Sequence, residues 1–150
     1  MAKNTIKLKN YSKVFEEYIA AGVITPGFLL EYTSEGKVQA HSSAGQNMIP
    51  MFALEDELQG NGITDAYEVD NQVQVWVPGR GDEVYALLKD GEDVAKGDFL
   101  ESDGNGYLQK HVAESSSYTN QIVAQALEVV DLSGSSGVDP ATQRIEVRIV

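Results

Sequence analysis

The side chains best suited to acid–base or metal chemistry in this sequence are its two histidines, His41 and His111. Imidazole titrates near neutral pH and binds metal ions readily. No His-x-x-x-His pattern and no carboxylate at ligand spacing accompanies either histidine. The chain has no cysteine, which excludes disulfides, thiolate zinc sites and cysteine nucleophiles. We therefore predict that both histidines make ordinary hydrogen bonds and that the chain binds no metal and no cofactor.

Other motifs with chemical meaning are incomplete. The acidic run 55–57 and the segment 103–107 lack the further ligands of a calcium loop. The tripeptide 80–82 (Arg-Gly-Asp) follows Pro78-Gly79 and is typical of a turn. No nucleophile elbow, phosphate-binding loop, His-Glu-x-x-His motif or dinucleotide fingerprint occurs. The sequence therefore favours a protein that is not an enzyme and has no catalytic residues.

One segment leaves a different class of protein open. Residues 90–100 resemble the Gly-Asp-x-Val-x-Lys-Gly-Asp turn of biotinyl and lipoyl carrier modules, which are small β structures built from two similar halves. A carrier needs a lysine at a hairpin tip with characteristic neighbours, and this context is missing here. The resemblance is taken at the level of the fold.

Charge is distributed unevenly along the chain. The formal net charge is −12, yet the first 13 residues hold four lysines and no acid. An acidic protein is a poor partner for nucleic acid, because phosphate binding depends on clustered Lys and Arg. No apolar run is long enough for a membrane helix, and the polar start lacks the apolar core of a signal peptide. We expect no nucleic-acid or membrane partner, and synthesis in the cytoplasm.

The chain begins with an expected N-terminal arm, residues 1–20. Ile6 and Leu8 alternate with Lys7 and Lys9, which is the period of a β-strand. Four lysines near a terminus fit either a solvated tail or a docking arm that pairs with a partner sheet. The segment 14–21 has mixed periodicity and is read as a short helix or an irregular strand.

The rest of the sequence predicts a mainly β fold. Short apolar segments are separated by glycine turns, at 28–32, 37–41, 73–77, 84–88, 99–101, 107–110, 122–130 and 144–150. The neighbourhood of residues 55–59 is the only other helix candidate. This spacing favours a small β-barrel or sandwich with at most one or two short helices.

An internal repeat organises these segments. Residues 24–41 align without gaps on 94–111, with matching glycines, Leu-Glu pairs, glutamines and histidines. Each copy is followed by an Ala-Leu-Glu run and then by an alternating strand. We predict two similar β modules, 21–78 and 79–150, closely joined and forming either two units or one compact domain. Chance similarity between glycine turns is the alternative.

Trp76 is the only tryptophan. In the alternating segment 73–77, Gln74 and Trp76 share one face and the three valines share the other. The valine face is expected in the core. Trp76 is then either covered by the second module or exposed as an interface anchor, since aromatic residues are enriched at interaction hot spots.

Taken together, several ordered segments resemble a known family: 24–31, 51–60, 73–85, 94–102 and 144–150. They look like the head decoration (capsid cement) proteins of tailed bacteriophages, over about residues 20–150. The resemblance implies a virion protein, usually a homotrimer, that binds the major capsid protein on the outside of the expanded head and stabilises contacts between capsid subunits.

The resemblance also assigns a role to the arm. In such families an N-terminal arm often orders only on the shell, so the candidate capsid-binding residues are Lys3, Ile6, Lys7, Leu8 and Lys9. Deletion of residues 1–10 is expected to leave the fold intact and to abolish capsid binding. A carrier-like or SAF-like β-clip binding module and a host-surface adhesin are the other classes left open.

Overall fold

The computed structural model describes residues 3–112, 120–134 and 143–150. The fold is mainly β, as predicted, and its one short helix in these ranges is the single turn η1 (Glu57–Gln59). The strands of the described residues are β1 (Lys7–Lys9), β2 (Val14–Ile19), β3 (Leu30–Tyr32), β4 (Val38–Ala40), β5 (Phe52–Ala53), β6 (Gln72–Val77), β7 (Glu83–Leu87), β8 (Asp93–Val94), β9 (Phe99–Ser102), β10 (Leu108–Lys110), β11 (Ile122–Ala126), β12 (Val130–Asp131) and β13 (Arg144–Ile149).

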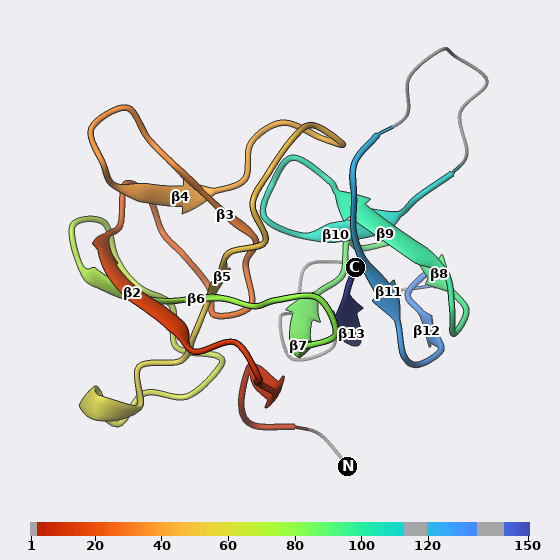
Figure 1. Ribbon diagram of the computed structural model, residues 1–150, viewed down its shortest axis with the longest axis horizontal. Helices are drawn as coiled ribbons and strands as arrows, with labels where there is room; N and C mark the ends of the chain where they lie inside the picture. Colours follow the sequence, from red (N-terminus) through yellow and green to blue (C-terminus); the bar gives the residue numbers. More distant parts are fainter. Residues whose placement is uncertain (1–2, 113–119, 135–142) are drawn as a thin grey trace.

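The strands form several small antiparallel sheets arranged in two lobes (Figure 1). We call residues 14–78 the first half and residues 79–150 the second half. The first half contains the sheet β2-β6-β5 and the hairpin β3-β4. The second half contains β7-β13-β11-β9-β10, with β1 added beside β7, and the pair β12-β8. Over the described ranges the sheets are sandwich-like and none closes into a barrel. No helix in those ranges is long and apolar enough to span a bilayer.

The predicted repeat is confirmed by strand register. In the first hairpin Leu30, Glu31 and Tyr32 face Ala40, Gln39 and Val38. The aligned residues of the second hairpin pair in the same way, with Leu100, Glu101 and Ser102 opposite Lys110, Gln109 and Leu108. The backbone N–H of His41 donates to Leu29 O, and that of His111 donates to the equivalent Phe99 O, both at 2.8 Å. The alignment therefore reflects a repeated three-dimensional unit.

The correspondence extends to the outer strands. Phe52 and Ala53 pair with Trp76 and Val75 in the first half. Gln125 and Ala126 pair with Arg148 and Val147 at the equivalent places in the second half. The first-half pair Ile19–Gln72 corresponds likewise to Leu87–Arg144. Strand β2 is thus the counterpart of β7, and β6 is the counterpart of β13. The ambiguous segment 14–21 contains strand β2 (Val14–Ile19), which belongs to the sheet of the first half rather than to the arm.

Two apolar clusters form the core. The smaller lies within the first half and includes Ile24, Val38, Val73 and Val75, all fully buried. The larger combines Ile6 from the arm and residues of the first half with most of the apolar residues of the second half. The two halves therefore share a core.

Trp76 belongs to the larger cluster and has no exposed surface. Its ring stacks at 6.4 Å from Phe15, and its Nε1–H donates to Ser12 O at 3.1 Å. Of the two placements expected for this residue, the structure has the covered one. The proposed interface anchor is not presented on the surface of the monomer, because the arm and the second half cover the face of β6 that the sequence left undecided.

The contact between the halves predicts unequal effects at two equivalent glycines. Gly36 and Gly106 both have positive φ, 79° and 86°. A Cβ on Gly36 meets no atom within 4 Å, whereas one on Gly106 lies 3.0 Å from Ala40 and Phe28 of the other half. We expect Gly36→Ala to cost about 1 kcal/mol of unfolding free energy, from backbone strain alone. Gly106→Ala should cost about 3 kcal/mol, since overpacking is added. Urea unfolding of both variants tests this, and equal losses would contradict the shared contact.

Candidate functional site

The N-terminal arm is extended, as predicted, but it is folded onto the protein. Strand β1 pairs antiparallel with β7, and Tyr85 N–H donates to Ile6 O at 2.9 Å. Ile6 is fully buried in the larger core cluster. Its N–H and the hydroxyl of Thr5 both donate to the carboxylate of Glu55, which is 5% exposed. In contrast to the prediction from the sequence, we therefore expect the fold to depend on the arm, because Ile6 is part of the core.

The lysines of the arm also contact the protein itself. Lys3 lies 3.3 Å from Glu146, and Lys9 lies 3.6 Å from Glu83. Lys7 Nζ lies 4.9 Å from the ring centroid of Phe15. Leu8 is partly buried, and Ile6 is unavailable to any partner. Of the candidate capsid-binding residues, Ile6 is buried, and the three lysines and Leu8 keep part of their side chains on the surface.

A buried carboxylate fastens the end of the arm. Asp82 is 1% exposed and accepts hydrogen bonds from the backbone N–H groups of Tyr11 (2.7 Å), Ser12 (3.1 Å) and Gly79 (2.9 Å). Burial alone would raise the pKa of Asp82, but these hydrogen bonds outweigh it and hold the pKa below its usual value. The Arg-Gly-Asp tripeptide is thus a structural turn, and its aspartate is not offered to a receptor.

Asp82 makes the attachment of the arm sensitive to acid. A carboxyl whose pKa is lowered on folding stabilises the fold above its unfolded pKa of about 3.9, and this contribution is lost as the pH falls toward the folded value. We expect Asp82→Asn to lower the unfolding free energy by about 2 kcal/mol at pH 7. The difference from wild type should shrink below about pH 4. Unfolding curves at pH 7 and pH 3.5 test this, and a gap independent of pH would contradict it.

The outer side of β2 is an unpaired strand edge. Strand β2 ends its sheet and pairs only with β6 on one side. Ala20 N–H donates to Asn71 O, so the alternation of an antiparallel ladder turns the backbone groups of Phe15, Glu17 and Ile19 outward. No hydrogen bond to these groups comes from the described residues. We call this row of free backbone groups the β2 edge.

Apolar and acidic side chains flank the β2 edge. Val14, Phe15 and Ile19 are 49%, 42% and 39% exposed. Glu16 is exposed, and Glu17 accepts hydrogen bonds from Gln72 and Gln74. Unpaired strand edges of this kind are templates for another strand unless charge or cover protects them.

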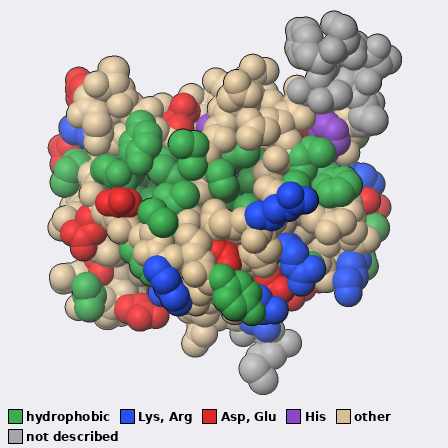
Figure 2. Space-filling view, in the orientation of Figure 1, with side chains coloured by type: hydrophobic (Ala, Val, Ile, Leu, Met, Phe, Trp, Pro, Cys, Tyr) green, Lys and Arg blue, Asp and Glu red, His purple; other side chains and the backbone are tan. Residues whose placement is uncertain are grey.

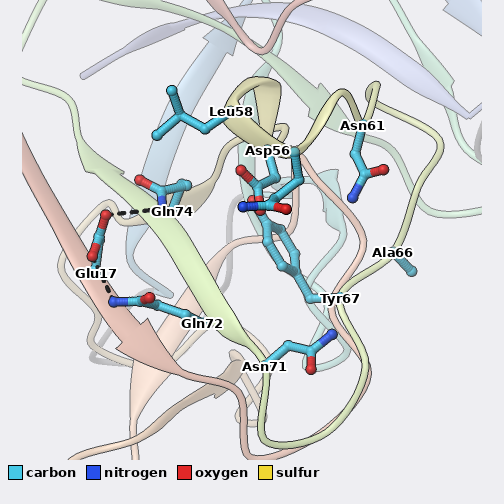
Figure 3. Close-up of a pocket in the computed structure, with 10 residues that line it drawn as sticks. Glu17, Asp56, Leu58, Asn61, Ala66, Tyr67, Asn71, Gln72 and Gln74 are labelled. Carbon is cyan, nitrogen blue, oxygen red and sulfur yellow. Dashed lines mark hydrogen bonds between the residues drawn. The ribbon is translucent and has the colours of Figure 1, made fainter.

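A groove of about 600 Å³ lies beside Glu17 of β2, against Gln72 and Gln74 of β6. Figure 3 shows Glu17, Gln72 and Gln74 on one side of it, and the loop that carries Asp56, Leu58 and Asn61 on the other. Five side-chain amides line the groove: Gln59, Asn61, Asn71, Gln72 and Gln74. A smaller groove of about 220 Å³ brings Phe15 together with Lys7 and the acidic run 55–57.

The first half is strongly acidic. Residues 14–78 hold ten acidic residues and one basic residue, Lys37. In Figure 2 the acidic side chains are spread over the left part of the molecule, where the first half lies, while most visible Lys and Arg side chains gather toward the lower right. The β2 edge therefore lies in a surface that attracts positive charge.

The histidines do not form a joint site. His41 is buried, with Nδ1 at 2.6 Å from Ser102 Oγ and Nε2 at 3.3 Å from Asn47 O. His111 Nδ1 lies 3.0 Å from Glu101 Oε1. Both make the hydrogen bonds expected from the sequence, with different partners. Within the described ranges, no group of three or more His, Asp or Glu residues is placed to hold a metal ion.

No model of a known protein family matches the chain, and no curated protein matches it. The function is therefore inferred from the structural features described above. Sequence reasoning missed the β2 edge and the hydrogen bonds by which Glu55 and Asp82 hold the arm. The repeat held one usable signal for strand β2. Segment 14–21 precedes the first aligned copy as segment 82–89 precedes the second, so the two segments are counterparts.

Proposed function

We propose that this chain is a structural virion protein that binds the outside of an expanded phage head and stabilises contacts between major capsid subunits, without a catalytic step. Its location would be the outer capsid surface, and its working form a homotrimer. The resemblance of segments 24–31, 51–60, 73–85, 94–102 and 144–150 to head decoration proteins supports this assignment. The chief structural support is the β2 edge, an exposed strand edge flanked by apolar residues.

A contact made through one short edge is modest by itself. Repeated over a capsid lattice, many identical contacts add up through multivalency, and a trimer binds at three points at once. The acidic surface of the first half would favour association with basic segments of the shell.

The experiment is co-sedimentation of the purified protein with expanded heads and with unexpanded proheads of the phage that encodes it. The proposal predicts saturable binding to expanded heads and at least a roughly ten-fold weaker affinity for proheads, a difference of about 1.4 kcal/mol. Absence of binding to both particles would overturn it.

A host-surface adhesin is a second candidate, favoured by the amide-lined groove beside Glu17. Side-chain amides offer both donors and acceptors, which suits a hydroxyl-rich ligand such as a glycan. Binding of the purified protein on a glycan array, lost in Asn61→Ala and kept in an exposed control such as Glu35→Ala, would support this candidate. A blank array would remove it.

A further inference from the structure

In one of the two repeated halves, the edge of the strand equivalent to β2 is already paired with another strand. In the second half, β7 takes up β1 through Val84 and Glu83, and Tyr85 N–H donates to Ile6 O. The register that aligns Ile19–Gln72 with Leu87–Arg144 makes Phe15 to Glu17 the counterparts of Glu83 to Tyr85. The first half therefore has, at the β2 edge, the same backbone groups that bind an added strand in the second half.

The neighbouring strands leave this stretch open in both halves. Strand β4 reaches β2 only beyond its end, where Ala21 N–H donates to Val38 O at 2.8 Å. Strand β10 meets β7 in the same way, with Lys89 N–H donating to Leu108 O at 2.8 Å. In the second half, the remaining length of the edge is where β1 lies. The equivalent length of β2 has no strand beside it in the described part of the chain.

Charge selects the kind of strand that fits. Glu16 and Glu17 lie at the centre of the β2 edge, and the acidic run 55–57 lines the groove next to Phe15. A second copy pairing its own β2 antiparallel to the centre of this edge would place Glu16 or Glu17 opposite the same residue of the copy, and like charges opposite each other destabilise a strand pair. The lysine-bearing arm of a second copy is already bound to its own β7. The best occupant is therefore a basic segment of another protein.

From these observations we infer that the β2 edge binds an extended, Lys- or Arg-bearing segment of the partner protein, antiparallel to β2 and in the register that β1 uses on β7. The inference rests on the proposed function and names the surface and the partner chemistry through which the capsid is bound. The backbone hydrogen bonds supply the register, and the acidic side chains select a basic strand.

Two variants test the edge in the binding assay with expanded heads. Glu16→Lys reverses the charge at the centre of the edge, and Glu17→Pro removes an outward N–H, at a kind of position where edge strands tolerate proline. We expect each variant to weaken binding by about ten-fold or more. Glu35→Lys is the matched control, since it makes the same charge change in the exposed turn between β3 and β4, and it should bind like wild type. Thermal unfolding of each variant checks that the fold is kept.

Hydrogen exchange on the wild-type protein gives a readout that does not depend on substitution. The amides of Phe15 and Glu17 should exchange more slowly on expanded heads than in free protein, because they gain hydrogen-bond partners. Wild-type affinity in both edge variants, or unchanged exchange at these amides in a protein that binds heads, would overturn the inference and leave the proposed function standing. Failure of the wild-type protein to bind heads would overturn both.

Discussion

Removal of residues 1–9 is expected to lower the unfolding free energy by about 4 kcal/mol or more. Ile6 is fully buried in the larger core cluster, and loss of a buried aliphatic side chain costs about 2–5 kcal/mol. The buried carboxylate of Glu55 would also lose its donors from Ile6 and Thr5, which adds about 1–3 kcal/mol. Urea unfolding of the truncated and full chains measures the difference.

Point variants separate these contributions. Ile6→Ala should cost about 3 kcal/mol. Leu8→Ala, on the same strand but partly exposed, should cost about 1 kcal/mol. A truncated chain as stable as the full one would show that the arm is a free tail after all, and it would restore the assignment of capsid binding to its residues.

Replacement of Arg144 is expected to have the second-largest effect. This guanidinium is 5% exposed, and it donates from Nη1 to Pro26 O at 2.9 Å and from Nη2 to Ile63 O at 2.7 Å. It therefore joins β13 of the second half to two carbonyls of the first half. Burial lowers the pKa of Arg144. The ordinary pKa of arginine is so high that the group stays charged all the same. A Cβ on residue 27 would lie 2.6 Å from Nη1 of Arg144, so the glycine at this position leaves the space that the guanidinium occupies.

We expect Arg144→Ala to cost about 3 kcal/mol, because one buried and one partly buried carbonyl lose their donors and a cavity forms. Arg148→Ala is the matched control on the same strand. Arg148 is partly exposed and pairs with Glu83 at 2.8 Å, and such surface pairs contribute about 0–1 kcal/mol. Denaturant unfolding of the two variants gives the comparison. Equal losses would mean that Arg144 does not join the halves.

Local sequence patterns were sufficient for much of the fold. The alternation at 73–77 gave strand β6 (Gln72–Val77), and the glycine turns placed the β3-β4 and β9-β10 hairpins within two residues of their observed bounds. The repeat was visible because its glycines fix the backbone at equivalent turns, as at Gly27 and Gly97, with φ values of 97° and 94°. These features depend on neighbours along the chain, and a single sequence contains them.

The candidate site depended on contacts between distant residues, which a single sequence does not contain. Nothing local distinguishes an arm that waits for a partner from one that pairs with β7, since the alternation of Ile6 and Leu8 fits both. Arg144 looks like a polar residue of an exposed face, and its partner Pro26 lies 118 residues away. Strand β2 was ambiguous because Glu16 and Glu17 interrupt its apolar pattern. The same two carboxylates would favour a basic strand at its edge.

We propose that this protein acts by attaching a β-rich body to a capsid lattice through the β2 edge. The most direct test is a cryo-electron microscopy map of expanded heads incubated with the purified protein. We expect trimeric density on the outer surface, with a strand of the major capsid protein beside Phe15 to Glu17 and with β1 still paired to β7. Bare heads at saturating protein, or density in which the β2 edge faces solvent, would contradict it.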